Sequence, residues 1–326
     1  MASVSDTAGG IARTPDEWGD DAERAYANRQ AALAEHYGVD VESRVVETAS
    51  AGPVHYLVAG DPDGEPVLLL HGVSTTAATW IPLLPALVDE YRVYVPDRPG
   101  RGLSAAPSYH GEDLRQFMVA YLLELLDAEG IDRPHVVGNS LGGQQALLLA
   151  LDHDRVDRLC LVGGPGGISR DFHVLFRLMT VRGVNRLVFW LLNRGEPMES
   201  ARESMAQINV VDDGAIPEEF YRVLAAHQDL PGRYESVRSL TEEQGSFGRM
   251  HSLFDLTDEM PRIERPTAFV WGSEDWFWPP DVGRPVAERM PDAEFYELDD
   301  HGHMPWMEPT DEAAATIRSF LDGEPP

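Results

Sequence analysis

One serine lies in a setting that suits nucleophilic catalysis, the segment Gly138-Asn139-Ser140-Leu141-Gly142. The segment follows a predicted strand at residues 135–137 and precedes a predicted helix at residues 141–151. Small residues on both sides of a serine allow a strained turn that lifts the hydroxyl off the top of a sheet. The alternative is a helix that Ser140 only caps, with glycines that serve close packing. The position between a strand and a helix favours a nucleophilic serine.

A serine hydroxyl attacks a carbonyl only if a base removes its proton. His301 and His303 lie beyond the last predicted strand, and one of them should face Ser140. Imidazole suits this role because it titrates near neutral pH. A carboxylate behind the base would fix its tautomer and stabilise the imidazolium. Asp275, which follows a predicted strand at residues 267–271, is expected to supply it, with Glu274 as the rival.

The third requirement is a pair of N–H donors for the negative charge that develops on the substrate oxygen. The loop His71-Gly72-Val73 follows an apolar segment at residues 67–70 that is typical of a buried strand. Parallel strands bring this loop to the same sheet edge as Ser140. The backbone N–H groups of Val73 and Leu141 are therefore expected to converge on one oxyanion. His71 itself is expected to be structural.

A glycine-rich loop at residues 97–104 begins with Asp97, which is expected to fix the loop by local hydrogen bonds. A phosphate cradle is disfavoured because the loop has no Walker lysine and no helix begins there.

Strand and helix patterns alternate along most of the chain. A hairpin is predicted at residues 44–58, and buried strands at 67–70, 91–95, 135–137 and 158–162 are separated by helical segments at 80–89, 112–129 and 141–151. After residue 267 the predicted order is strand 267–271, helix 281–289, strand 294–298 and helix 311–321. This alternation predicts an α/β fold with a mostly parallel sheet and helices on both faces.

Two parts of the chain depart from the alternation. Residues 1–14 are small and polar and are expected to be frayed, and a helix is expected over residues 15–37. Residues from about 167 to 267 contain helix-like apolar segments without strand-like alternation. They are interpreted as an inserted helical subdomain.

The order Ser140, Asp275, His303 on this framework resembles the α/β-hydrolase superfamily. The resemblance covers residues 44–321 and includes His71-Gly72, the loop at 97–104, Trp271-Gly272-x-x-Asp275 and Gly302-His303. It implies an eight-stranded sheet and assigns the base to His303 rather than His301. The implied domains are an N-terminal helical extension at 1–40, a hydrolase core at 41–166 and 263–326, and a helical cap at 167–262. The implied enzyme acts through an acyl-enzyme on Ser140 and uses no cofactor and no metal.

Within the superfamily, the elbow and the Asp275 motif are similar to those of hydrolases that cleave carbon–carbon bonds of aromatic meta-cleavage products. Those enzymes carry extra glycines after the His-Gly pair, whereas this chain has Val73-Ser74-Thr75-Thr76. A carboxylic ester hydrolase for small or medium apolar esters is therefore the first expectation, and C–C hydrolysis is the alternative. A ligand-binding protein of this fold with little turnover is the alternative of another class.

Aromatic side chains are the candidates for the substrate pocket. Those next to Asp275 and two on the cap are proposed to contact a small-molecule substrate: Trp276, Phe277, Trp278, Phe176 and Trp190. Three cap arginines are interpreted as solvated surface, although they would suit a substrate carboxylate: Arg177, Arg182 and Arg186.

Composition limits the partners. The 326 residues include 55 acidic and 26 basic residues, a formal net charge of −29, which excludes non-specific binding to nucleic acid or to anionic membranes. The lone Cys160 excludes an internal disulfide. No apolar segment follows the first cation, Arg13, so a cytoplasmic protein is expected. A homo-oligomer is left open.

All 26 basic residues are arginine. An acidic surface without lysine suggests adaptation to molar salt, because repulsion between carboxylates is screened within about 3 Å at 1 M salt. The alternative is an acidic protein from an organism with a GC-rich genome.

Overall fold

The computed structural model describes residues 9–169, 174–192, 195–208, 213–246 and 249–324. A central sheet of nine strands has the order β1-β2-β3-β5-β4-β6-β7-β10-β11. The three pairs at the N-terminal edge are antiparallel, and the other five pairs are parallel. The mostly parallel sheet agrees with the prediction from the alternation of strand and helix patterns.

The strands are β1 Ile11–Ala12, β2 Val41–Thr48, β3 Gly52–Gly60, β4 Glu65–Leu70, β5 Tyr91–Pro96, β6 His135–Asn139, β7 Leu159–Val162, β10 Thr267–Gly272 and β11 Ala293–Leu298. Strands β8 Gly245–Ser246 and β9 Arg249–Met250 form a separate two-stranded sheet.

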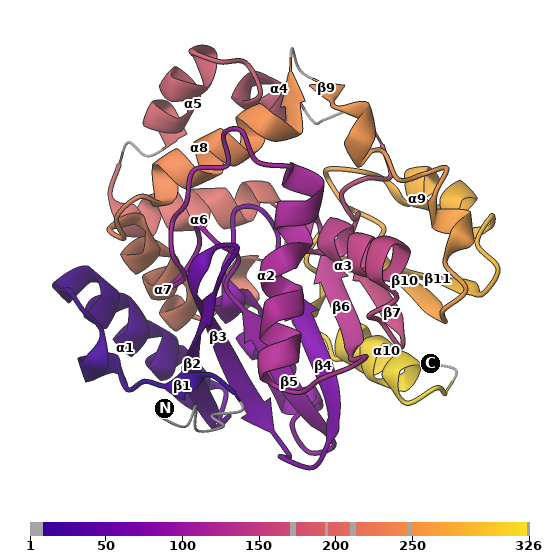
Figure 1. The fold of residues 1–326 in the computed structure, drawn as a ribbon, viewed down its shortest axis with the longest axis horizontal. Helices are drawn as coiled ribbons and strands as arrows, with labels where there is room; N and C mark the ends of the chain where they lie inside the picture. The colour runs from indigo at the N-terminus through magenta and orange to yellow at the C-terminus, as the bar shows by residue number, and fades with distance from the viewer. Residues whose placement is uncertain (1–8, 170–173, 193–194, 209–212, 247–248, 325–326) are drawn as a thin grey trace, which may run out of the picture.

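Helices cover both faces of the sheet (Figure 1). One apolar core lies under α2 Leu114–Ala128, α3 Leu141–His153 and α9 Pro280–Ala287. The other lies under α1 Asp21–His36, the 3₁₀ segment η2 Ala77–Ala86 and α10 Glu312–Leu321. No helix in the described part of the chain is both long and apolar enough to cross a bilayer.

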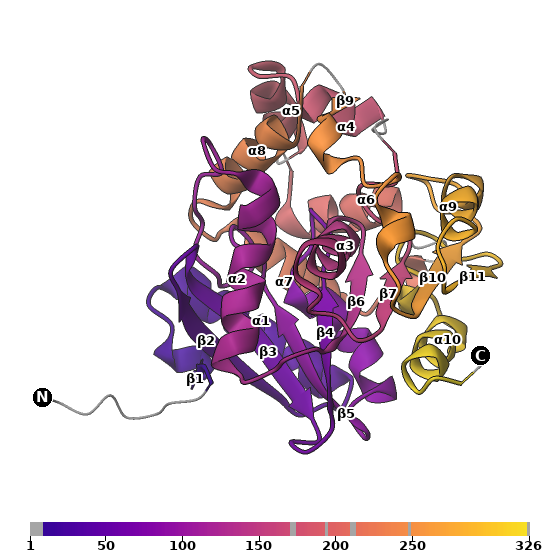
Figure 2. The same cartoon turned by 45° about the vertical axis from the view of Figure 1, so that its right-hand side comes forward.

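Between β7 and β10 the described residues form five α-helices: α4 Val174–Met179, α5 Val184–Leu192, α6 Pro197–Ile208, α7 Glu218–Gln228 and α8 Arg233–Gln244. They lie above the sheet edge at which the parallel strands end (Figures 1 and 2). Helix α7 also packs against α1, so the N-terminal helix contacts this helical layer.

The ninth strand was not expected, because residues 1–14 were predicted to be frayed. Ile11 and Ala12 pair with β2, and the backbone N–H of Gly10 donates to Tyr56 Oη and Glu129 Oε1, both at 2.8 Å. These bonds hold the segment from residue 9 onward on the sheet.

Two predicted helices have a different form. Only a 3₁₀ turn, η1 Pro15–Glu17, forms where a helix from residue 15 was expected, and α1 begins after Asp20, whose side chain accepts from the N–H of Glu23. The segment predicted as a helix at 80–89 is the 3₁₀ segment η2, because Pro82 and Pro85 lack the N–H that an α-helix needs.

Candidate active site

Ser140 joins β6 to α3 in a strained turn. Its φ is +54°, a conformation that a residue with a side chain rarely adopts. The flanking glycines make the turn feasible: a Cβ on Gly142 would lie 2.1 Å from the carbonyl oxygen of Leu70. Within the described residues, the Ser140 side chain forms no capping hydrogen bond to α3. This strand–turn–helix geometry matches the turn predicted for a nucleophilic serine and differs from that of a helix that Ser140 caps.

Asp275 and His303 are hydrogen-bonded at the same sheet edge. The Nδ1 of His303 lies 2.7 Å from Oδ2 of Asp275, and both side chains are buried. The carboxylate also accepts from the backbone N–H groups of Gly164 at 2.9 Å and Phe277 at 2.9 Å. These donors fix the carboxylate in the orientation that presents one oxygen to the imidazole.

The other imidazole nitrogen of His303, Nε2, is buried and has no hydrogen-bond partner among the residues that the structure describes. With Nδ1 donating to Asp275, a neutral imidazole carries its lone pair on Nε2. This nitrogen is therefore available to accept a proton.

The rival residues have other surroundings. Both ring nitrogens of His301 are engaged, Nδ1 with the carbonyl oxygen of Asp299 at 2.7 Å and Nε2 with Thr310 Oγ1 at 2.9 Å. The side chain of Glu274 is exposed, and its backbone N–H donates to the carbonyl oxygen of His301. Both ring nitrogens of His301 are thus occupied, and in the described part of the chain the carboxylate that bonds His303 is that of Asp275 rather than that of Glu274.

The loop after β4 lies beside Ser140. A Cβ on Gly72 would lie 3.4 Å from the Cβ of Ser140. The loop is fixed by the buried guanidinium of Arg98, which donates to the carbonyl oxygens of Gly72 at 3.3 Å and Val73 at 2.9 Å. The oxyanion role predicted for the N–H groups of Val73 and Leu141 is compatible with this position.

His71 supports the loop. Its Nδ1 donates to the carbonyl oxygen of Gly72 at 2.8 Å, and its Nε2 accepts from the backbone N–H of Arg98 at 3.0 Å. Burial and the neighbouring charge of Arg98 lower the pKa of His71 to about 3, so it is neutral at working pH. These contacts agree with a structural role.

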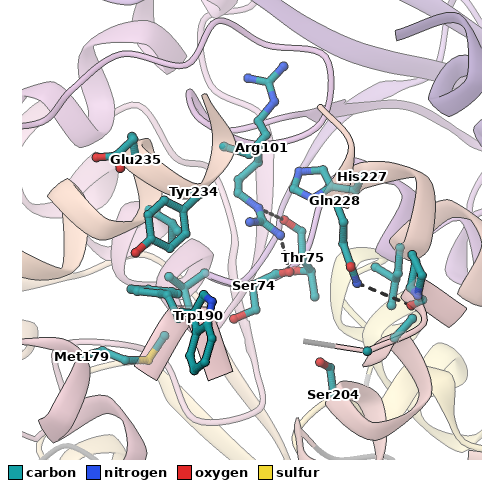
Figure 3. A pocket seen from close by; sticks show the side chains of 18 of the residues that line it. Ser74, Thr75, Arg101, Met179, Trp190, Ser204, His227, Gln228, Tyr234 and Glu235 are labelled. Carbon is teal, nitrogen blue, oxygen red and sulfur yellow. Dashed lines mark hydrogen bonds between the residues drawn. The ribbon is translucent and has the colours of Figure 1, made fainter. Parts of the chain in front are cut away.

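A cavity of about 1170 Å³ lies between the helical layer and the catalytic edge (Figure 3). Of the predicted pocket residues, Trp190, Trp276 and Phe277 line it. The ring of Phe277 also lies edge-on to the ring of His303, with centroids 4.6 Å apart. The cavity therefore reaches Phe277, which lies against the candidate base His303, although His303 and Ser140 are not themselves among its lining residues.

The other residues that were predicted as candidates for substrate contact do not all line this cavity. Trp278 packs against the core under α2, α3 and α9, and its carbonyl oxygen accepts from Trp271 Nε1. The side chain of Phe176 lies outside the described residues. Arg186 lines the cavity, whereas Arg182 forms ion pairs with Glu242 and Glu243.

One end of the cavity carries two arginines and a histidine that the sequence analysis did not identify: Arg101, Arg233 and His227. Arg101 donates to the carbonyl oxygens of Ser74 and Thr75, as Figure 3 shows. Burial and the charges of Arg98 and Arg233 lower the pKa of Arg101 to about 9.

His227 lies beside these arginines. Its Nε2 is buried without a hydrogen-bond partner in the described part of the chain, and burial followed by the charges of Arg101 and Arg233 lowers its pKa well below the usual value. Within the described ranges, no carboxylate pairs with Arg101 or Arg233 in a salt bridge. This end of the cavity is therefore suited to an anionic group.

Metal ligands are not grouped at the site. Among the residues that the structure describes, no three His, Cys, Asp or Glu side chains are clustered as ligands of one ion would be.

Comparison with known proteins defines the class. The sequence matches the alpha/beta hydrolase family over residues 67–316. It is 30% identical over 278 residues to the 2-hydroxy-6-oxo-6-phenylhexa-2,4-dienoate hydrolase of Burkholderia cepacia, covering 82% of this chain and 91% of that protein. The chain therefore belongs to the alpha/beta hydrolase family, and it is a hydrolase.

Solved structures show the same fold. Carboxylesterase CesB of Bacillus subtilis has a TM-score of 0.73 at 18% identity, covering 93% of this chain and 99% of that one. The meta-cleavage product hydrolase CumD of Pseudomonas fluorescens IP01 has a TM-score of 0.68 at 23% identity, covering 86% and 97%. The chain is thus similar both to esterases and to C–C bond hydrolases.

Proposed function

We propose that Ser140, His303 and Asp275 form a catalytic triad that hydrolyses carboxylic esters through an acyl-enzyme. The observation that carries the proposal is the buried His303, which is bonded to Asp275 through Nδ1 while Nε2 lacks a partner among the described residues. The strained turn at Ser140 and the adjacent Gly72 loop support it.

In the first half-reaction, Ser140 Oγ attacks the ester carbonyl carbon while His303 Nε2 takes the hydroxyl proton. Asp275 stabilises the imidazolium that forms. The N–H groups of Val73 and Leu141 would donate to the oxyanion, each contributing about 3–4 kcal/mol to transition-state stabilisation. His303 then protonates the leaving alkoxide, and water releases the acyl group by the same steps in reverse.

Residues 167–262 act in this proposal as a cap over the active site. The cavity walls support this role, because they combine residues of the helical layer such as Met179, Leu187 and Phe189 with Val73 and Phe277 from the catalytic edge. Apolar walls of this kind suit the acyl or alcohol part of a small or medium ester.

A second candidate function is C–C hydrolysis of a meta-cleavage product. The arginine-lined end of the cavity favours it, because such a substrate carries a carboxylate, and the relative from Burkholderia cepacia is named for a reaction of this type. Arg101 and Arg233 would hold the carboxylate of such a substrate. They would bind an ester in the same way if that ester carried a carboxylate of its own.

The two functions are separated by a panel of p-nitrophenyl esters of increasing acyl length and a 2-hydroxy-6-oxo-dienoate. A higher kcat/KM on short or medium esters supports the proposal. Faster turnover of the dienoate, with a KM that rises in Arg233→Gln but not in the control Arg182→Gln, establishes the second candidate. A burst without a steady state on every substrate points instead to a ligand-binding protein.

The cellular location of the protein and its adaptation to salt are also part of the proposal. We infer a cytoplasmic protein adapted to high salt, on the basis of its net charge of −29 and the use of arginine alone as the basic residue.

A further inference from the structure

A second Ser–His–Asp chain of hydrogen bonds lies at the antiparallel end of the sheet. Ser43 of β2 has its Oγ 3.0 Å from Nε2 of His55, which belongs to β3. The Nδ1 of the same imidazole lies 2.6 Å from Oδ2 of Asp97, just beyond β5. The connectivity is that of a nucleophile, a base and an orienting carboxylate, and it involves none of the residues of the proposed triad.

Asp97, the carboxylate in this series of hydrogen bonds, is held as an anion. Asp97 is fully buried and also accepts from the backbone N–H groups of Ala77 at 2.8 Å and Leu103 at 3.0 Å. Burial opposes its ionisation, but the hydrogen bonds from His55 and from the backbone N–H of Ala77 contribute to lowering the pKa of Asp97 below its usual range. His55 Nδ1 therefore donates to Asp97, which leaves Nε2 to accept the hydroxyl proton of Ser43.

Ser43 borders a separate cavity of about 320 Å³ between α1 and the sheet. This volume lies near the lower end of the range of roughly 300–1,000 Å³ for small-molecule sites. The walls are mainly small and apolar, including Ala27, Ala31, Ala34 and Leu57.

Two unused N–H donors belong to residues that line this cavity. The Nε1 of Trp18 and the Nε2 of Gln30 are buried, and neither has a hydrogen-bond partner in the described part of the chain. The Trp18 ring also packs edge-on to the imidazole of His55, with centroids 5.5 Å apart.

A Ser–His–Asp chain alone also arises where a serine only satisfies a buried histidine. The adjoining cavity distinguishes this case, since it supplies room for an acyl group beside Ser43. We propose that Ser43 is a second nucleophile, which accepts small neutral acyl groups from esters such as acetates.

In this reaction, Ser43 Oγ bonds to the ester carbonyl carbon while its proton passes to His55 Nε2. The bond between that carbon and the leaving oxygen then breaks, and His55 returns the proton to the leaving group. The product is an acetylated Ser43 and a free alcohol or phenol, so no oxidant, reductant or further reactant is required.

The test uses the full chain with Ser140→Ala, which removes the nucleophile of the first site, and p-nitrophenyl acetate as the probe. We expect a stoichiometric burst of p-nitrophenolate and an acetyl group that peptide mass spectrometry assigns to Ser43. The burst should disappear in Ser140→Ala/Ser43→Ala and persist in the control Ser140→Ala/Ser108→Ala, which changes an exposed serine.

Two results would overturn the proposal: no burst in Ser140→Ala, or acetyl groups only at other residues. The mass assignment in Ser140→Ala does not depend on how the Ser43 variant folds. It is also independent of the first site, because failure of the proposed triad would appear as unchanged steady-state turnover in Ser140→Ala.

Discussion

The side-chain amide of Asn139 donates a hydrogen bond of 2.9 Å to the backbone carbonyl oxygen of His303. The same amide donates to the carbonyl oxygen of Val162 at the end of β7. The residue before the candidate nucleophile thus fixes the loop that carries the candidate base. This bond links the position of His303 to that of Ser140, although Asn139 and His303 are 164 positions apart in the sequence.

Replacing Asp275 with asparagine should remove most of the activity. The introduced side-chain amide would place its N–H₂ group either at the Oδ2 position, facing His303 Nδ1 and the N–H of Gly164, or at the Oδ1 position, facing the N–H of Phe277. The first orientation inverts the tautomer that leaves Nε2 free, the second sets two donors against each other, and both remove the charge that stabilises the imidazolium. We expect a loss in kcat of about 10⁴-fold, as an inverted tautomer causes in other triads. Steady-state ester hydrolysis measures the loss, and Glu274→Gln serves as the exposed neighbouring control. Equal losses in both variants would contradict the role of Asp275.

The two histidines should differ strongly when each is changed to alanine. His303→Ala removes the base, and we expect kcat to fall by about 10⁴-fold or more. His301→Ala removes bonds to Asp299 and Thr310 only, so its kcat should stay within about tenfold of the wild-type value. The inverse ranking would assign the base to His301.

Strand positions and the catalytic motifs were predictable because their signals are local. Buried strands such as residues 67–70 are continuous apolar segments, and the elbow at Ser140 is encoded by glycines within two residues of it. The family match confirmed the α/β-hydrolase fold. The number of strands was wrong by one, since β1 depends on bonds from Gly10 to Tyr56 and Glu129, which lie far away in the sequence.

The cationic end of the cavity could not be predicted for the same reason. Arg233 begins α8 and donates to the carbonyl oxygen of Ser104, 129 residues away, and His227 reaches the same place from α7. Nothing in the sequence around either residue distinguishes it from a surface residue of an amphipathic helix. Their proximity to Arg101 arises only when the helical layer packs on the loop after β5.

The free energy of unfolding should decrease as the pH is lowered, partly because His71 and His227 are buried in their neutral form. The folded-state pKa of His71 is about 3 and that of His227 lies well below the usual 6.5. Below pH 6.5 the unfolded chain therefore binds protons that the folded chain does not. For each unit by which the pH falls, each of these histidines lowers the free energy of unfolding by about 1.4 kcal/mol. Urea unfolding at pH 7, 6 and 5 measures the slope. His227→Gln should reduce it by one histidine's share, and an unchanged slope would refute that contribution.

Salt should stabilise the folded chain. With 55 acidic and 26 basic residues, folding gathers like charges on a compact surface. The screening length falls from about 10 Å at 0.1 M salt to about 3 Å at 1 M, so most of this repulsion disappears. We expect the melting temperature and the ester hydrolase activity to rise together with KCl over this range. A flat or falling melting temperature would favour genomic bias as the reason for the missing lysines.

The central claim is that Ser140 is the nucleophile of ester hydrolysis, and one comparison tests it most directly. Steady-state hydrolysis of p-nitrophenyl butyrate is measured for Ser140→Ala and for the wild-type chain, with thermal unfolding to verify the fold. Only a hydroxyl is lost, so the unfolding curve should be unchanged while kcat falls by about 10⁴-fold or more. A correctly folded Ser140→Ala chain whose kcat stays within about tenfold of wild type would contradict the proposed mechanism.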